Sequence, residues 1–190
     1  MGTLQVGGTT LGVKNTSTNK VDLSNASIGS DTVFPAGGTG NAISVAVIAD
    51  EKSSGSDAGS TTANTFQKRT LNTEISDPDG IVSLSNSQFT LGAGTYHIYF
   101  QAPNFRGDAH KTAIYDDTGS AFLAFGTNMH SGQNDTSSIS SGSVVHSPSG
   151  SNVYELQHRC AAAKSSNGFG TSCTFNQVEV YALVIISKLK

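Results

Sequence analysis

The run of residues 178–186 constrains the fold more than any other segment of the chain. Its sequence, VEVYALVII, is strand-like, and from Val180 onward both of its alternating faces are apolar. Successive side chains of a strand point to opposite sides of a sheet, so one face can enter the core of the domain while the other needs a second apolar partner. We expect that partner to be another copy of the same chain.

The composition removes two classes of partner. Charged residues make up 13% of the 190 residues, where soluble domains usually carry about 25%, so Ser, Thr, Asn and Gly must form much of the surface. The net charge of −3 comes from scattered groups without the basic stripe of a nucleic-acid binder. No apolar run reaches the roughly 18 residues of a membrane span, and the first residues lack a signal-peptide pattern. We therefore expect neither nucleic acid nor membrane as a partner, and synthesis in the cytoplasm.

The chain is predicted to have two parts. Residues 1–40 hold eight glycines and three short apolar pairs at strand spacing, which is too little to fill a core. We interpret them as an extended Gly/Thr-rich arm that becomes ordered on its own domain or on a neighbouring protein, or else as a partly disordered terminus. Residues 41–190 are predicted to form one globular domain.

The globular part shows short strand patterns separated by turn residues. Turns are indicated by Asp77-Pro78-Asp79-Gly80 and by glycine-containing runs such as 92–94, 117–119 and 147–150. Residues 51–64 contain no large apolar side chain and are expected to form an exposed, mobile loop. Short strands without a 3.6-residue period predict an antiparallel sandwich. The expected strands are 43–49, 66–71, 81–84, 89–91, 95–102, 112–115, 121–125, 144–146, 153–158 and 175–186.

The strand at 95–102 has two different faces. Tyr96, Ile98, Phe100 and Ala102 form an apolar face, which we assign to the core. The opposite face carries Thr95, His97, Tyr99 and Gln101, a mixture that suits either solvent or a subunit contact. We predict that His97 and Tyr99 contact another subunit.

Several segments resemble known families. Residues 92–100, GAGTYHIYF, look like the mid-domain strand of the tumour necrosis factor and complement globular-head superfamily. The runs 47–55, 68–75 and 154–158 resemble domains found in virion proteins of tailed bacteriophages. Together the resemblance covers about residues 33–187.

The resemblance implies a ten-stranded jelly roll assembled as a threefold trimer, with the last strand near the trimer axis. Tyr181, Leu183 and Ile185 would then form the outward face of that strand. Phage members are similar to fibre, spike-associated or capsid-decorating proteins, and the family has no catalytic residues to carry over. The arm becomes a candidate anchor on the major capsid protein or another virion protein, through Leu4, Val6, Leu11, Val13, Val21 and Leu23.

The residue spacing argues against an enzyme. No two of the five histidines lie within four residues of each other, so the metal-binding patterns HxH and HExxH are absent. Asp77-Pro78-Asp79-Gly80 lacks the later ligands of a calcium loop, and no nucleophile elbow or phosphate-binding loop occurs. We expect no catalytic residues, no metal and no cofactor.

Two further features leave alternatives open. Cys160 and Cys173 could form a disulfide or remain two buried thiols. The polar run 131–143 could be an exposed strand edge or a loop, and with residues 51–64 it offers hydroxyl and amide groups that could contact a host surface glycan.

The sequence thus predicts a homotrimeric viral structural protein on the capsid surface that decorates and cements a phage head. The alternative is a tail-fibre or head-fibre protein that binds a host receptor.

Overall fold

The computed structural model describes residues 3–6, 9–15, 20–22 and 43–189, and the chain divides into two compact units, Met1–Ala42 and Ile43–Lys190. The described residues contain strands, turns and loops. Because none of them is helical, this part of the chain offers no helix with the length and apolarity to cross a membrane.

The described residues of the first unit form a small antiparallel sheet. Its strands are β1 (Thr3–Val6), β2 (Thr9–Asn15) and β3 (Lys20–Asp22), in the order β1-β2-β3. Two of the three apolar pairs at strand spacing, and Val21 of the third, therefore lie in segments that pair with one another. Of the predicted anchor residues, Leu4 and Val6 lie in β1, Leu11 and Val13 in β2, and Val21 in β3, whereas Leu23 lies outside the described residues.

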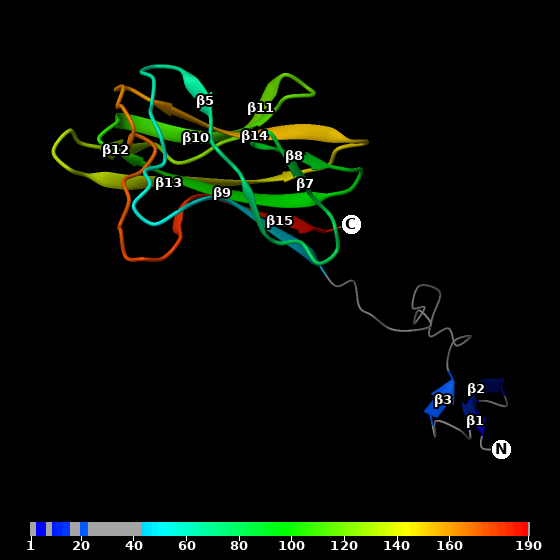
Figure 1. Ribbon diagram of the computed structural model, residues 1–190. Helices are drawn as coiled ribbons and strands as arrows, with labels where there is room; N and C mark the ends of the chain where they lie inside the picture. Colours follow the sequence, from blue (N-terminus) through cyan, green and yellow to red (C-terminus); the bar gives the residue numbers. More distant parts are fainter. Residues whose placement is uncertain (1–2, 7–8, 16–19, 23–42, 190) are drawn as a thin grey trace. The chain divides into compact units, whose positions relative to one another are not determined.

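The second unit is a sandwich of two antiparallel sheets, which form its two layers in Figure 1. The five-stranded sheet has the order β13-β9-β15-β4-β6, and the seven-stranded sheet has the order β11-β10-β14-β8-β7, with β12 beside β10 and β5 beside β14. The first sheet comprises β13 (Ser137–His146), β9 (Tyr96–Phe105), β15 (Glu179–Lys188), β4 (Ser44–Lys52) and β6 (Thr73–Ser76). The second comprises β11 (Ala121–Phe125), β10 (Asp108–Asp116), β14 (Asn152–Cys160), β8 (Gln88–Leu91), β7 (Ser83–Ser85), β12 (Met129–Ser131) and β5 (Phe66–Lys68).

This arrangement confirms the predicted all-β antiparallel sandwich. The described part of the second unit has twelve strands rather than the ten that the resemblance implied. Five of the twelve, β5, β6, β7, β8 and β12, are only three or four residues long. Two of these, β6 and β12, fall where the sequence shows no apolar alternation.

The core lies between the two sheets and follows the alternation of each strand. In β9, Tyr96, Ile98, Phe100 and Ala102 are at most 1% exposed, as the sequence predicts. The remaining core residues come from both sheets and from two connections: Ala46, Ile48, Leu71, Val82, Phe89, Leu91, Ile114, Tyr154, Leu156, Ala182, Val184 and Ile186.

The connection of residues 51–64 is only in part the exposed loop that its composition predicts, since residues 53–56 are exposed but two later positions are not. Ala58 and Thr61 are buried. The Ala58 amide donates to Gly170 O at 3.0 Å, and the Thr61 amide donates to Lys164 O at 2.8 Å. At these two positions the prediction was wrong, because small residues can pack closely against another segment, here 161–170, without large apolar side chains.

Asp77-Pro78-Asp79-Gly80 forms a turn, as the sequence predicts. The Asp77 carboxylate accepts hydrogen bonds from the amides of Ile81 (2.9 Å) and Val82 (2.8 Å), and Gly80 has a φ of +62°. Both carboxylate oxygens of Asp77 are therefore used to close the turn.

Candidate functional site

The outward side of the five-stranded sheet brings together most of the residues predicted to contact another subunit. In the antiparallel register, Ile185 of β15 lies between Tyr99 of β9 and Val47 of β4. Ser187 in the same strand lies between His97 and Val45. Since β13 continues these rows beyond β9, four strands contribute to one surface.

We call this surface the open sheet face, made of the outward side chains of β13, β9, β15 and β4. Val145, Ile139 and Val45 are 61%, 51% and 37% exposed, whereas His97, Tyr99, Val47, Leu183 and Ile185 are half-buried. A sheet face with this many accessible aliphatic and aromatic atoms is typical of a contact surface. Its polar members include Gln101, whose Oε1 accepts a hydrogen bond from the Tyr99 hydroxyl at 2.9 Å.

Tyr181 departs from this arrangement. It lies on the same side of β15 as Leu183 and Ile185 but is only 7% exposed, because Ala58 and Phe169 of its own chain cover it. Its hydroxyl donates to Ser56 O at 2.8 Å, and burial, followed by the nearby charge of Glu179, raises the pKa of Tyr181 to about 12. The prediction that Tyr181 contacts another subunit therefore does not fit the structure.

Glu179 organises the loops that end beside Tyr181. One carboxylate oxygen accepts hydrogen bonds from the amides of Gly55 (3.0 Å) and Thr174 (2.9 Å), and the other accepts one from the amide of Cys173 (3.0 Å). These backbone donors lower the pKa of Glu179 because they stabilise the ionised form. A single carboxylate thus joins segments more than 100 residues apart.

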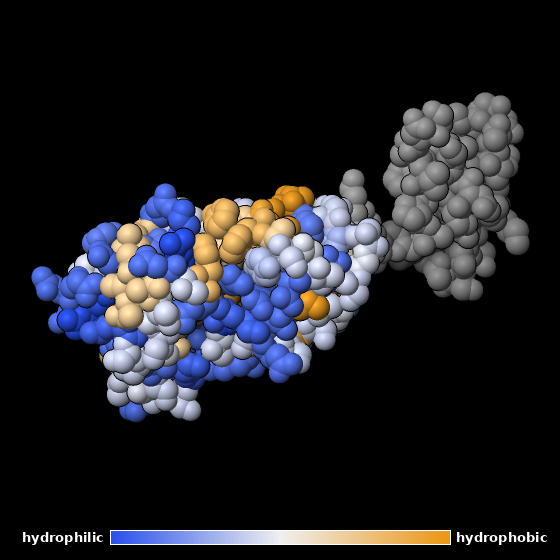
Figure 2. Space-filling model, turned by 90° about the horizontal axis from the view of Figure 1, so that it is seen from above, coloured by the Kyte–Doolittle hydropathy of each residue, from blue (hydrophilic) through white to orange (hydrophobic). Residues whose placement is uncertain are grey.

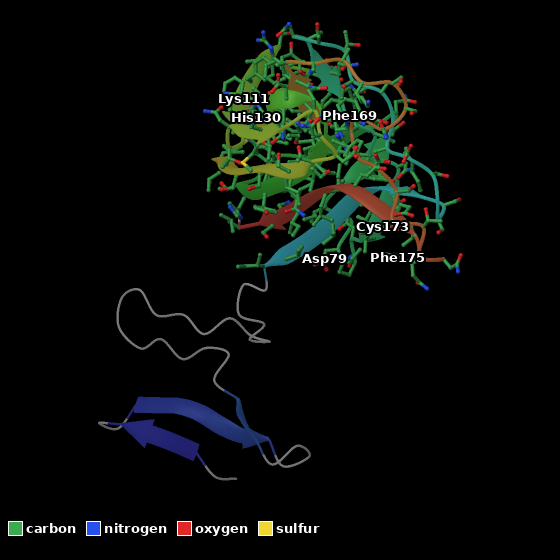
Figure 3. All side chains as sticks on the ribbon, turned by 90° about the vertical axis from the view of Figure 1, so that its left-hand side faces the viewer. Asp79, Lys111, His130, Phe169, Cys173 and Phe175 are labelled. Carbon is green, nitrogen blue, oxygen red and sulfur yellow. The ribbon has the colours of Figure 1, made fainter. Side chains whose placement is uncertain are left out.

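Both cysteines are free, so the disulfide alternative does not hold, and only Cys160 is a buried thiol. Cys173 is exposed on the segment 171–178, and in Figure 3 it lies with Phe175 at the margin of the domain, whereas Phe169 lies farther inside. Phe175 is 76% exposed.

A cluster of polar side chains lies between the sheets. Arg69 is fully buried and donates to Pro103 O and Phe169 O, each at 3.0 Å, while its guanidinium lies 4.2 Å from the centre of the Phe169 ring. Arg69 Nη1 also lies 3.4 Å from His158 Nδ1. Burial lowers the pKa of Arg69 to about 10, so this side chain is a cation at neutral pH.

Two histidines continue the cluster. His158 Nε2 lies 2.9 Å from His110 Nδ1, and His110 Nε2 lies 2.8 Å from Ser138 Oγ and 3.1 Å from Ser131 Oγ. Burial, and next the charge of Arg69, lower the pKa of His110 to about 4 and hold that of His158 well below its usual value. Both imidazoles are therefore neutral at pH 7 and can share one proton in each hydrogen bond.

The cluster resembles a serine–histidine pair only in residue type. Of the two serines at His110, Ser131 is fully buried and Ser138 is half-buried, and His158 faces a guanidinium rather than the carboxylate that would orient a general base. Within residues 43–189 and the described strands before them, no group of three His, Cys, Asp or Glu side chains is placed to hold a metal ion. We interpret the cluster as structural, connecting β10, β13 and β14 across the end of the sandwich.

The fold defined by these sheets is the jelly roll of the tumour necrosis factor and complement 1q type. No protein-family model and no curated protein sequence matches the chain. Solved structures match it at low sequence identity, which shows the fold alone.

One is the globular domain of complement 1qA protein from zebrafish, with 13% identity and a TM-score of 0.52, covering 77% of this chain and 98% of that one. Another is murine APRIL at pH 5.0, with 8% identity and a TM-score of 0.52, covering 78% and 100%. A third is the vertex protein P5 of bacteriophage PRD1, with 12% identity and a TM-score of 0.51, covering 80% and 100%.

Proposed function

We propose that the protein is a homotrimeric structural component of a virion, assembled through the open sheet face, and that it decorates and cements a phage capsid. The observation that carries the trimer is this face, where four strands present accessible Val, Ile, Leu and Tyr side chains in register. Covering this face with another copy would remove apolar surface from water. Each Å² of apolar surface that is buried in this way stabilises the assembly by about 25 cal/mol.

Two similarities support a virion role. The jelly roll is shared with the vertex protein P5 of bacteriophage PRD1, and several sequence runs resemble virion proteins of tailed phages. Under this proposal the first forty residues bind the major capsid protein or another virion protein, with Leu4, Val6, Leu11, Val13, Val21 and Leu23 as contacts, and the jelly roll of residues 41–190 trimerises.

Assembly is tested by light scattering behind a sizing column. The wild-type protein should report three copies, and Ile185→Asp should report one, because an unpaired charge in a desolvated contact costs several kcal/mol. Phe175→Asp is a matched control, since it introduces the same charge at an exposed apolar position outside the open sheet face. A wild-type monomer, or a trimeric Ile185→Asp variant, would contradict the proposed interface.

Capsid binding is a separate test. Full-length protein should bind purified capsids of the parent phage at a fixed stoichiometry, and deletion of residues 1–32 should abolish binding while light scattering still reports a trimer. Unchanged binding by the truncated trimer would exclude the arm as the anchor. If isolated trimers instead adsorb to host cells and block infection, the receptor-binding alternative replaces the cement role.

A further inference from the structure

The other face of the sandwich, the outward side of the seven-stranded sheet, carries a cavity of about 490 Å3. This volume falls within the about 300–1,000 Å3 of typical small-molecule sites. The cavity lies between β5, β10, β11, β12 and β14. Both sheets of the sandwich separate it from the open sheet face. Its lining includes Asn64, Phe66, Lys111, Phe125, Asn128 and Arg159.

Aromatic rings form one side of this cavity and extend beyond it. Phe66 of β5 lies 4.8 Å from Phe122 and 6.0 Å from Phe125, both of β11, as measured between ring centres. Phe122 and Phe125 are 40% and 53% exposed, so a large part of each residue is accessible to a ligand rather than buried in the core. Figure 2, which looks down on this side, shows apolar residues gathered among hydrophilic ones.

Two cations lie beside these rings. Lys111 of β10 and Arg159 of β14 are direct cross-strand partners, and like charges in that position destabilise a sheet. Lys111 Nζ lies 5.7 Å from the centre of the Phe125 ring, and the Arg159 guanidinium lies 6.0 Å from that of Phe66. The two rings are thus flanked by two positive charges.

No described carboxylate forms a salt bridge with either cation. Glu155, which also points outward from β14, is bound by Lys68 at 3.4 Å and by Gln88 at 2.9 Å. The protein has a net charge of −3, but these two adjacent cations have no described anionic partner. A bound anion would therefore stabilise them.

We propose that this cavity binds an acidic sugar residue, a hexuronate or sialate, of an anionic glycan. Its carboxylate lies between Lys111 and Arg159, where Arg159 can form a bidentate pair. The apolar face of the sugar ring packs against Phe66 and Phe125, while the exposed Asn64 and Asn128 at the rim offer amide groups to its hydroxyls. A glycan fits better than a peptide because flat aromatic faces and amides match a ring that alternates C–H surface with hydroxyl groups.

This inference does not rest on the trimer or on capsid binding. It is tested on the full-length protein by isothermal titration calorimetry with oligogalacturonate, its methyl ester and a sialylated oligosaccharide. The ester keeps the sugar rings and removes the charge. We expect at least one acidic probe to bind and the ester to bind at least tenfold more weakly than the free acid.

Three variants locate the site. Lys111→Gln and Arg159→Gln should each weaken the binding of the acidic probe by about tenfold or more, and Phe125→Ser should weaken the acid and any residual ester binding alike. Lys188→Gln, on the five-stranded sheet, is the charge-matched control and should leave the affinity unchanged within about twofold. Lys111, Phe125 and Arg159 are all at least partly exposed, so we expect their variants to fold. A melting temperature measured for each variant verifies this.

Four results would overturn the proposal. They are the absence of binding by both acidic probes, equal binding of acid and ester, equal effects of Lys188→Gln and Arg159→Gln, and displacement of the sugar by inorganic phosphate or polyglutamate at the same concentration. The last result would define an anion site that does not select sugars.

Discussion

Because Gly170 has no side chain, the backbone of segment 161–170 can lie directly against Tyr181. Gly170 has a φ of +142°, a conformation that residues with a Cβ rarely adopt. A Cβ at this position would lie 2.5 Å from Cδ1 of the Tyr181 ring. The close approach of this backbone explains why the outward side of β15 is buried at Tyr181 and accessible at Leu183 and Ile185.

We predict that Gly170→Ala destabilises the protein by about 2 kcal/mol, since it combines backbone strain with a steric clash. Gly150→Ala is the control, because its Cβ would meet no atom within 4 Å. Urea unfolding at constant protein concentration measures both variants. Equal urea midpoints for the two variants would contradict the close contact of segment 161–170 with Tyr181.

Removal of one charge from the pair on β10 and β14 should have the opposite effect. Without ligand, Arg159→Gln is expected to raise the free energy of unfolding by about 0.5 kcal/mol, because it relieves a cross-strand repulsion. The increase should shrink at high salt, where the repulsion is screened. A decrease in stability at low salt would mean that the contact of Arg159 with Phe66 outweighs its repulsion by Lys111.

Residue-level prediction from the sequence worked where contacts are local. The alternation in 95–102 identified the buried side chains of β9, since inward and outward positions follow from strand geometry alone. It failed at Tyr181, because the residues that cover it come from segments 53–58 and 161–170. Lys111 and Arg159 were missed for the same reason. The exposed aromatics of 121–125, the sequence AFLAF at a sheet edge, were the only local signal for the cavity.

Among the elements, β10 and β14 carry an unusual inward face that changes along its length. Ile114 and Leu156 are packed in the apolar core, whereas His110 and His158, farther along the same strands, belong to the polar cluster around Arg69. One pair of strands therefore contributes both kinds of interior. The stability of the polar end depends on both imidazoles staying neutral.

This dependence predicts a loss of stability in acid. The folded-state pKa of His110 is about 4, below the value of about 6.5 in an unfolded chain, and that of His158 is lowered as well. Between these values the unfolded chain binds protons that the folded chain does not. The free energy of unfolding should therefore be highest above about pH 6.5 and fall below it, by about 1.4 kcal/mol per pH unit for each histidine that stays neutral.

Urea unfolding at several pH values between about 7.5 and 4.5 measures this slope. His110→Gln should reduce the slope, because one proton-binding difference is removed. A wild-type stability that is constant from pH 7.5 to 5 would contradict the neutral, buried histidine pair.

Elements were predictable in proportion to their apolar content. The long strands β4, β9, β14 and β15 were located from alternation and turn residues, but their ends were misplaced by several residues. The serine-rich start of β13 carries few apolar side chains, so a strand edge and a loop could not be distinguished from sequence. It is a strand because it pairs with β9 along ten residues, which uses backbone groups that every residue has.

For the whole molecule, assembly should be visible in its stability. If three copies share the open sheet face, unfolding separates them, so a tenfold rise in protein concentration should stabilise each chain by about 1 kcal/mol. Differential scanning calorimetry would then show a melting temperature that increases with concentration for the wild type and for Phe175→Asp. The melting temperature of a folded Ile185→Asp monomer should not depend on concentration.

The fold of residues 43–189 followed from the turn spacing and the resemblance, but the surfaces of this unit did not. Which residues of the open sheet face remain accessible depends on long-range packing, and the position of the cavity depends on how β5 and β11 lie beside β14 and β10.

The two sheets separate the open sheet face from the cavity by the thickness of the sandwich. A trimer joined through one face would therefore leave three copies of the other turned toward its surroundings. Weak binding at each cavity would then act together on a repetitive glycan, because after the first site is occupied the next sugar residues are already nearby at a high effective concentration. Millimolar affinity at a single site would be enough for firm attachment, and a monomeric variant would lose that attachment with every cavity intact.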